Sequence, residues 1–312
     1  MLTTIPILQD TRGNTIIGDT SKQNNLSINF GGGGNIVFFA GSSKGVRIEF
    51  VGNGALVFIG DNVEISQGDM MSQSKGRIRI TDYSTCYVDR NSGLGSSFLH
   101  ILEGKNVIIG RDCMFSYELW LWNSDTHMIF DATTYQRIAK GESFYIGDHV
   151  WLGWGVSGIK KFFAASGSVI GVKSLLTGGK IFFSNTANGG TPCKMLRDNI
   201  FWLRDGTWNW SENKRQNYES LANVSDTIQQ HIFTFEPDKF LSPELIETQL
   251  NTYDNPLDKL RFLYNYLYCN TNKNRFALFK DSNYRDSKLY CENPNAFDAL
   301  NFSAPQLMQY GK

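Results

Sequence analysis

The sequence has no long hydrophobic run and no excess of either charge. Its 30 basic and 30 acidic residues balance, so the chain as a whole carries no field that would attract nucleic acid or an anionic membrane. No stretch approaches the roughly 18 consecutive apolar residues that a membrane helix needs. The first residues also lack the basic start and apolar core of a signal peptide. We therefore expect a cytoplasmic protein with no transmembrane segment and no nucleic-acid partner.

Cysteine is also scarce, and its spacing excludes two kinds of scaffold. No CxxC pair and no Cys/His group has the spacing of a structural zinc site, and an odd number of widely separated thiols does not suggest a disulfide framework. We expect reduced thiols and no metal. The five cysteines are Cys86, Cys113, Cys193, Cys269 and Cys291.

What the chain does contain is a period of six. Three segments begin with Ile-Gly and repeat apolar residues at the first, fifth and seventh positions: "IGDNVEI" (59–65), "IGRDCMFSYELWL" (109–121) and "IGDHVWLGWGV" (146–156). An α-helix repeats every 3.6 residues, whereas a step of six is typical of a triangular solenoid whose flat faces each use one hexapeptide. From Ile146 the step runs through Leu152, Gly158, Ala164, Ile170 and Leu176.

We therefore expect a mainly β chain in which residues 1–210 form a parallel β-helix, stabilised by stacking the aliphatic residues of successive coils. The less regular stretch 28–105 leaves a β-sandwich open as the alternative. From about residue 211 glycine becomes rare and apolar residues recur three to four apart, so residues 211–312 are expected to be an α-helical appendage. The helix signals are Leu221, Val224, Ile228 and Ile232, the Ser242-Pro243 pair, and Pro256 at a first helical position.

Residues 122–145 interrupt the period of six, and His127 lies in this stretch, within "NSDTHMIFD". Repeat proteins place insertions on one face, often the face that binds, because a loop there costs little stability. A histidine on a loop is more often a solvated bystander than a catalyst, so the surrounding sequence has to decide its role.

Three stretches decide it: "SDTHMIFD", "IGDHVWLGWGV" and "GGTPCKMLRDNIFW". Together they resemble the hexapeptide-repeat acyltransferase family of left-handed β-helices, especially its bacterial capsular and polysaccharide O-acetyltransferases, over roughly residues 100–202. The resemblance implies a left-handed β-helix, acetyl-CoA as donor, and a homotrimer with active sites between subunits. It also implies that His127 is the catalytic base and that Trp151 lies beside it.

The residues themselves point to an anion site and to sugar contacts. No acidic residue lies between His149 and Arg197, so the basic side chains there form a local positive region that suits the phosphates of coenzyme A. An ordinary solvated basic face is the alternative. We expect Lys160, Lys173 and Lys194, with Trp151 and Gly153, to hold the coenzyme. The other basic residues of the region are Lys161, Lys180 and Arg197.

Alternation along "FSYELWLWN" turns Trp120 and Trp122 outward, where they either stack on sugar rings or pack against a second subunit. A sugar hydroxyl needs a base at neutral pH, and an imidazole such as His127 can take its proton. Asp125 is a candidate to orient that imidazole, and backbone N–H groups around Gly153 to hold the oxyanion. His149 is the rival base, although its place in "GDHV" favours a role in the turn.

These observations predict an acetyl-CoA-dependent O-acetyltransferase that acts on a saccharide, such as a bacterial capsular or surface polysaccharide. Two alternatives stay open: an N-acetyltransferase of a nucleotide-linked amino sugar, and a non-catalytic carbohydrate-binding β-helix. The sequence does not identify the sugar, the hydroxyl, or whether the acceptor is polymer or monomer.

Overall fold

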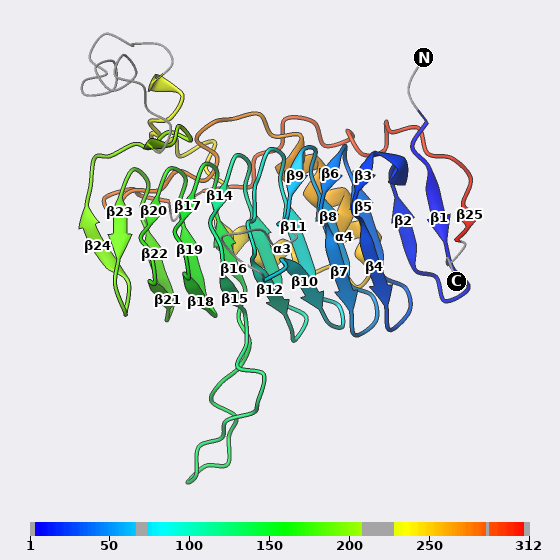
Figure 1. The fold of residues 1–312 in the computed structure, drawn as a ribbon, viewed down its shortest axis with the longest axis horizontal. Coiled ribbons are helices and arrows are strands. Elements are labelled where there is room, and N and C mark those ends of the chain that lie inside the picture. The colour runs from blue at the N-terminus through cyan, green and yellow to red at the C-terminus, as the bar shows by residue number, and fades with distance from the viewer. Residues whose placement is uncertain (1–3, 67–73, 208–227, 285–286, 309–312) are drawn as a thin grey trace.

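The protein is a parallel β-helix of three faces, as the period of six predicts (Figure 1). The structure, a computed structural model, describes residues 4–66, 74–207, 228–284 and 287–308. Within these residues each strand pairs in parallel with the equivalent strands of the coils before and after it, and antiparallel pairs occur at the two ends, β1 with β2 and β23 with β24. Parallel pairing of successive coils excludes the β-sandwich.

The largest face, here the ten-stranded face, contains in spatial order β22 (Lys180–Phe182), β19 (Phe162–Ala164), β16 (Phe144–Ile146), β13 (Asn106–Ile109), β11 (Thr85–Val88), β8 (Leu56–Ile59), β5 (Ile36–Phe39), β2 (Thr15–Ile17), β1 (Ile7–Gln9) and β25 (Gln306–Leu307). The seven-stranded face contains β21 (Leu175–Thr177), β18 (Ser157–Ile159), β15 (Trp120–Trp122), β12 (Phe98–Ile101), β10 (Arg77–Ile80), β7 (Arg47–Phe50) and β4 (Ser27–Phe30).

The third face is built from two short sheets. One contains β14 (Met114–Phe115), β17 (Trp151–Leu152), β20 (Val169–Ile170), β23 (Ala187–Gly189) and β24 (Lys194–Arg197), and the other β3 (Gln23–Asn24), β6 (Ser43–Lys44) and β9 (Val63–Glu64). Isolated bridges through Gly93 join β9 to β14. The described helices are η1 (Thr20–Lys22), α3 (Pro243–Leu250), α4 (Pro256–Phe262) and the π-helical η3 (Leu263–Tyr268).

The interior of the solenoid confirms the predicted inward positions. Every aliphatic residue of the six-step series that starts at Ile146 is buried in one continuous core. A side chain added at Gly158 would meet the Phe162 ring at 2.7 Å, so the ring fills the space that this small residue leaves. Phe162 in turn stacks on Phe144 of the preceding coil at 4.7 Å. Burying one such large apolar side chain contributes about 1.5–3 kcal/mol.

Residues with positive φ form the corners between faces. This backbone region is least costly for Gly, Asn and Asp. It is used at Asn62, Asn91, Asp112 and Asn185, and also at His149 (φ 52°). The turn role expected for His149 is therefore confirmed.

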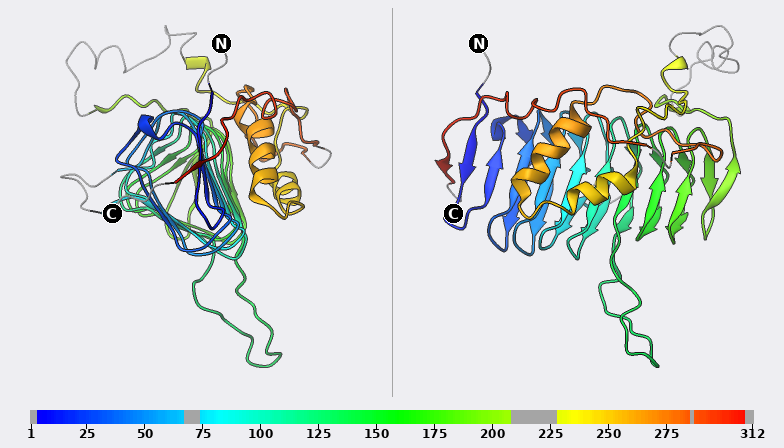
Figure 2. Two further views of the ribbon diagram at one scale, coloured as in Figure 1. Left: turned by 90° about the vertical axis from the view of Figure 1, so that its right-hand side faces the viewer. Right: turned by 180° about the vertical axis from the view of Figure 1, so that it is seen from behind.

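The ten-stranded face is apolar on both sides, which explains the continuous hydrophobic runs "IVFF" and "LVFI". Its inward residues line the solenoid core, while outward residues such as Phe38, Phe58 and Tyr145 form a second core with Leu260 and Leu263 of the C-terminal helices. Figure 2 shows α3 and α4 lying against this one face. The C-terminal segment therefore covers surface that the solenoid could not leave in water.

The C-terminal segment is less helical than expected. Pro256 does begin a helix, with the Asn255 side chain accepting a hydrogen bond from the N–H of Asp258, and Pro243 begins another. Most of the described residues after 268 form turns and extended stretches, because asparagine side chains there bind neighbouring backbone groups in place of a helix. Leu221 and Val224 lie outside the described residues.

The end of the chain returns to its beginning. β25 pairs with β1 in parallel, and the N–H of Ile5 donates to the carbonyl of Asn301 at 2.7 Å. The C-terminal segment thus runs the length of the solenoid and covers the free edge of its first strand (Figure 1). A covered edge cannot template the pairing of another chain.

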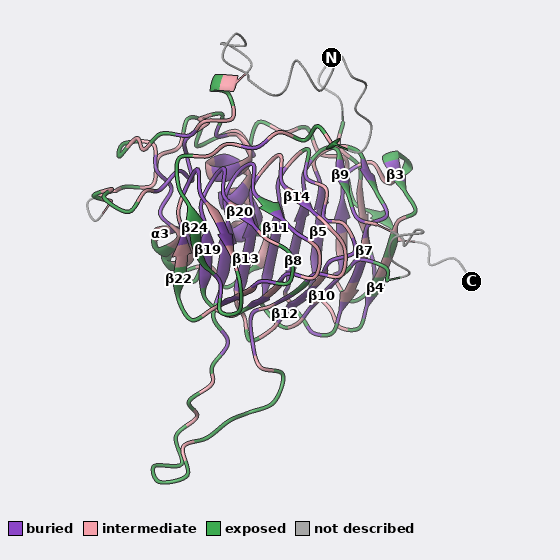
Figure 3. Cartoon of the chain, turned by 60° about the vertical axis from the view of Figure 1, so that its left-hand side comes forward, coloured by how far each residue is buried: buried purple, intermediate pink, exposed green. Residues whose placement is uncertain are grey.

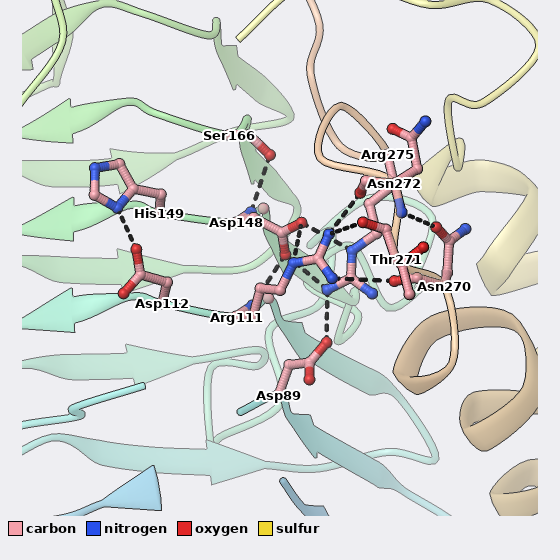
Figure 4. A network of polar contacts seen from close by, with 12 residues as sticks. Asp89, Arg111, Asp112, Asp148, His149, Ser166, Asn270, Thr271, Asn272 and Arg275 are labelled. Atoms are coloured by element: carbon pink, nitrogen blue, oxygen red, sulfur yellow. Dashed lines mark hydrogen bonds and ion pairs between the residues drawn. The ribbon is translucent and has the colours of Figure 1, made fainter. Parts of the chain in front are cut away.

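A buried ion cluster attaches this segment to the corners of the coils (Figure 4). The Arg275 guanidinium is fully buried and lies 2.6 Å from Asp89 and 2.7 Å from Asp148. Arg111, from the coil between them, also pairs with Asp148, at 3.5 Å, and donates to the carbonyl of Asn270 at 3.1 Å. Burial alone would raise the pKa of Asp148, but the charges of Arg275 and Arg111 hold it below its usual value.

Replacing Arg275 with Met should lower the free energy of unfolding by about 3–5 kcal/mol, because two buried carboxylates would lose their partner. Urea unfolding at pH 7 measures the change. Arg261→Met is the control, since Arg261 pairs with Asp258 and Asp298 at the surface and its loss should cost less than about 1 kcal/mol. Equal stabilities of the two variants would contradict the role given to Arg275. Because the pKa of Asp148 is lowered, this contribution is present above pH 4 and is lost at more acidic pH.

Candidate functional site

The predicted interruption of the solenoid is a long loop. Residues 123–143 leave the end of β15 and return at the start of β16, close to the predicted limits of 122–145. The loop projects from the corner between the seven-stranded and ten-stranded faces (Figures 1 and 2). Its base is closed by the N–H of Glu142, which donates to the carbonyl of Asn123 at 2.9 Å.

Two side chains fix this base to the preceding coil. The Asn123 amide accepts from the N–H of Leu102 at 2.7 Å and donates to the carbonyl of Leu102 at 2.9 Å. Glu103 accepts from Arg137 at 2.7 Å, from the N–H of Gly141 at 3.1 Å and from Ser124. Burial alone would raise the pKa of Glu103, but these three hydrogen bonds lower it to about 2. Glu103 therefore stays ionised and holds both strands of the loop.

The tip of the loop is a tight turn, and its sides are exposed. The Asp131 carboxylate accepts from the N–H groups of Thr133 and Thr134, and these hydrogen bonds lower the pKa of Asp131. Asp131 is thus a turn-former. His127 lies on the outgoing part of the loop and is exposed. Figure 3 shows that most of the loop is exposed. The exposed apolar residues of the loop are Met128, Ile129, Phe130, Tyr135 and Ile138.

Asp125 has a partner other than the one expected for it. Its carboxylate forms an ion pair with Lys160, the corner residue of the next coil. Lys160 was expected to hold the coenzyme, and Asp125 to orient His127. The two side chains form an ion pair with each other, two positions before His127, and this pair attaches the outgoing part of the loop to the next coil.

The lysine series has partners that its own stretch of sequence does not contain. Lys161 pairs with Glu142 at 3.3 Å, and Lys173 lies 3.9 Å from Glu118. With the Lys160 pair, three of the six basic residues therefore face acids from earlier coils. Lys194 is exposed on β24. The positive electrostatic potential of this region is therefore weaker than its local composition predicts, because these acids neutralise part of the charge.

Trp151 lies on the third face, where its side chain is 36% exposed. Its ring is 5.9 Å from that of Trp202, which stacks on His149 at 4.0 Å with the rings 8° apart. His149 and Trp202 also exchange hydrogen bonds, because the Trp202 indole donates to the His149 carbonyl and the His149 ring contacts the Trp202 carbonyl, both at 3.1 Å. One wall of the Trp151 site is therefore rigid.

Residues 199–205, here called the strap, fasten this wall across the corners of successive coils. The other ring nitrogen of His149 lies 2.6 Å from Asp112 (Figure 4). Arg204 binds the same carboxylate at 2.9 Å and donates to the carbonyl of Cys113 at 3.0 Å. Asp112, Trp202 and Arg204 were not predicted as residues of the site. The only signal was the Asp and His at the fourth position of "IGRD" (109–112) and "IGDH" (146–149), because the strap follows the last regular coil.

The remaining expected positions are placed as follows. Trp120 and Trp122 point outward from β15 on the seven-stranded face, and Trp120 is 51% exposed. Trp120 and Lys173 line one groove of about 580 Å³. The Gly153 N–H donates to the carbonyl of Ile170 at 2.8 Å, so it belongs to the ladder and is not free to hold an oxyanion. This one N–H is therefore excluded from the expected oxyanion site, and a role for the other N–H groups around Gly153 stays a prediction.

The two central candidates are not neighbours within one chain. The loop with His127 leaves at the corner between the seven-stranded and ten-stranded faces, whereas Trp151 lies on the third face, which is opposite that corner. Among the described residues, no group of three or more His, Cys, Asp or Glu side chains is placed to hold a metal ion. No helix in the same residues has the length and hydrophobicity needed to cross a membrane.

Comparison with known proteins gives relatives of one kind, although no family model matches the chain. The chain is 35% identical over 133 residues to a polysialic acid O-acetyltransferase of Escherichia coli O1:K1, which is 43% of each chain. It is 32% identical over 152 residues to a polysialic acid O-acetyltransferase of Neisseria meningitidis, which is 47% of this chain and 66% of that protein. The chain thus spans about half to two thirds of the length of these relatives.

The fold agrees with this similarity. The crystal structure of the polySia-specific acetyltransferase NeuO superposes with a TM-score of 0.54 at 26% identity, covering 69% of this chain and 93% of that structure. The predicted resemblance to polysaccharide O-acetyltransferases with a β-helix fold is confirmed.

Replacing Glu103 with Gln should loosen the loop, because a neutral amide cannot hold Arg137 and Ser124 as the carboxylate does. We expect proteolysis or hydrogen exchange within residues 123–143 to be several-fold faster at pH 7, with the exchange of β13 unchanged. In the wild-type protein the anchoring is present above the usual carboxyl pKa of 4.5 and is lost as the pH falls toward 2. Glu64→Gln, which breaks the exposed pair with Lys44, is the control, and equal loop exchange in both variants would contradict this role.

Proposed function

We propose that the protein transfers the acetyl group of acetyl-CoA to a hydroxyl of a sialic acid polymer or a closely related capsular polysaccharide. The observation that carries the proposal is the sequence similarity to two polysialic acid O-acetyltransferases, on the fold that one such enzyme also has. The exposed imidazole on the anchored loop and the tryptophan-lined third face supply the chemistry. Acetyl-CoA is made inside the cell, and five free thiols fit a reducing compartment, so we place the protein in the cytoplasm.

In this proposal His127 is the general base. Its imidazole takes the proton of the sugar hydroxyl as the oxygen attacks the thioester carbonyl, which makes an alkoxide-like nucleophile available at neutral pH. The C–O bond forms, the C–S bond breaks, and the imidazolium returns the proton to the departing thiolate. Products are the acetyl ester and coenzyme A. A covalent cysteine intermediate is unsuitable, because Cys113 is fully buried and its burial raises the pKa of the thiol.

The coenzyme is assigned to the third face of the solenoid. Trp151, held by Trp202, offers an apolar wall to the acyl end, and Lys173 and Lys194 are exposed cations suited to the phosphates. Lys160 joins them only if a ligand or a neighbouring subunit displaces Asp125.

A site that contains both His127 and Trp151 needs two copies of the chain. The loop and Trp151 are on opposite sides of one solenoid, and the loop carries exposed apolar residues that a second copy would cover. The ten-stranded face is unavailable for this contact, because the C-terminal helices cover it. We therefore assign the active enzyme as a homotrimer in which the loop of one subunit approaches the third face of the next.

His127→Ala should reduce acetyl transfer to a sialic acid polymer by about 10²–10⁴-fold while leaving acetyl-CoA binding intact, because only the base is removed. Transfer is followed by thiol release and by mass spectrometry of the polymer, and binding by calorimetry. Gln136→Ala is the matched control, since Gln136 is an exposed residue of the same loop. Full activity of His127→Ala would reject the base, and an acetylated product that is stable to mild alkali would be an amide and not an ester.

Mixing inactive subunits tests the shared site. If His127 and Trp151 of different subunits form each site, then His127→Ala and Trp151→Ala chains that are refolded together should regain about a quarter of wild-type activity, because that share of the interfaces pairs two intact residues. Each variant alone should stay inactive. Failure of the mixture to recover, with mixed trimers shown by mass spectrometry, would place both residues of a site in one chain.

A further inference from the structure

The outer side of the seven-stranded face carries a stripe of arginine and aromatic side chains. The strand register aligns Arg77, Phe98 and Trp120 in one row along successive coils. It aligns Arg79, His100 and Trp122 in a second row beside the first. Adjacent coils of a β-sheet are about 4.8 Å apart, so each row presents a side chain at that interval. We call these six residues the arginine–tryptophan stripe.

The stripe is electropositive. Arg77 is exposed and lies 4.1 Å above the Phe98 ring, and Arg79 lies 3.5 Å from Glu49 on the next strand. Burial lowers the pKa of His100, and the charges of Arg79 and Arg77 lower it further, whereas Glu49 opposes them less strongly. Arg47 adds a third guanidinium on β7. The titratable groups that face His100 therefore give a net positive field.

The aromatic part of the stripe is a continuous surface. Trp120 lies 5.4 Å from Trp122 and 5.9 Å from Phe98, measured between ring centroids. Half of the Trp120 side chain is exposed. An exposed indole next to guanidinium groups suits a ligand that is apolar on one side and anionic on the other, as a sugar acid is.

Two ring nitrogens of the second row have no hydrogen-bond partner among the described residues. They are the Nδ1 of His100 and the Nε1 of Trp122. His100 is only 7% exposed, so its nitrogen cannot rely on bulk water. Buried polar groups are normally paired, because an unpaired one costs about 1–3 kcal/mol. The Trp122 indole can only donate, so it requires an acceptor oxygen on the partner that covers this face.

We propose that the arginine–tryptophan stripe binds the anionic polysaccharide and leads it to His127. Carboxylates of the polymer pair with Arg77 and Arg79, and the apolar side of a sugar ring packs on Trp120. The second row ends at Trp122, and the loop with His127 begins at the next residue, so a bound chain is led toward the loop that carries the base. This inference rests on the proposed function for the identity of the polymer. A second copy of the chain is the competing occupant of the face.

The double variant Arg77→Gln/Arg79→Gln tests the proposal. Titration of the wild-type protein with a sialic acid polymer, without acetyl-CoA, gives a reference Kd and its salt dependence. We expect the double variant to bind about tenfold more weakly and with a shallower salt dependence, because two charge-assisted contacts are lost. Its KM for the polymer should rise while its KM for acetyl-CoA does not. Binding should also raise the pKa of His100, observed by NMR, since an anion favours the imidazolium.

Lys22→Gln/Lys44→Gln is the matched control. It removes two exposed cations away from the seven-stranded face and should change the Kd by less than about twofold. Unchanged polymer affinity in the arginine variant would overturn the proposal. Loss of its oligomeric state in sedimentation would do the same, because it would show that the face joins copies of the chain.

Different results would contradict the proposed function and the proposed stripe. If the wild-type protein binds another anionic polysaccharide through these arginines but does not acetylate sialic acid polymers, the stripe stands and the assigned substrate is wrong. If the wild-type protein acetylates the polymer and the arginine variant binds it equally well, only the stripe is wrong. Binding of neutral dextran as tightly as of the sialic acid polymer would also overturn the stripe.

Discussion

The architecture depends on hydrogen bonds that each coil makes with the coils on either side. No coil satisfies its own backbone, so an insertion is tolerated only where the chain leaves and re-enters at the same register. The loop of residues 123–143 meets this condition, since Asn123 and Glu142 close its base and the strands before and after it keep their places in two different faces. An exposed imidazole can then be carried away from the solenoid without weakening the ladder.

The three faces differ in what they contact because their outward residues differ. Outward phenylalanine and tyrosine make the ten-stranded face a core in its own right, and the C-terminal segment covers it and is fixed there by Arg275. The third face presents Trp151 with the strap behind it, and the seven-stranded face presents arginine and tryptophan. Covering one face leaves outward side chains of the other two exposed.

Much of the solenoid could be predicted from sequence, since a six-residue period directly reports which side chains face inward. Leu121, Val150 and Leu152 are buried as expected, and the loop lies where the period breaks. The polar contacts could not be predicted in this way. Lys160 pairs with Asp125 and Lys173 pairs with Glu118 because the stacking of coils brings together residues that are 35 and 55 positions apart. Local composition does not indicate such pairs. The C-terminal segment was predicted only in part, at the helices that begin at Pro243 and Pro256, because the rest of it follows the surface that it covers more than its own helix propensity.

The contact between β25 and β1 ties the length of the C-terminal segment to the number of coils in the solenoid. The segment starts near the last coils and is attached along the way at Arg275 and α4, so its path length must equal the height of the stack. One additional coil would move β1 away from β25 by about 4.8 Å, more than a hydrogen bond can bridge. Evolution can therefore lengthen or shorten this solenoid only by changing both parts of the chain together, although they lie far apart in the sequence.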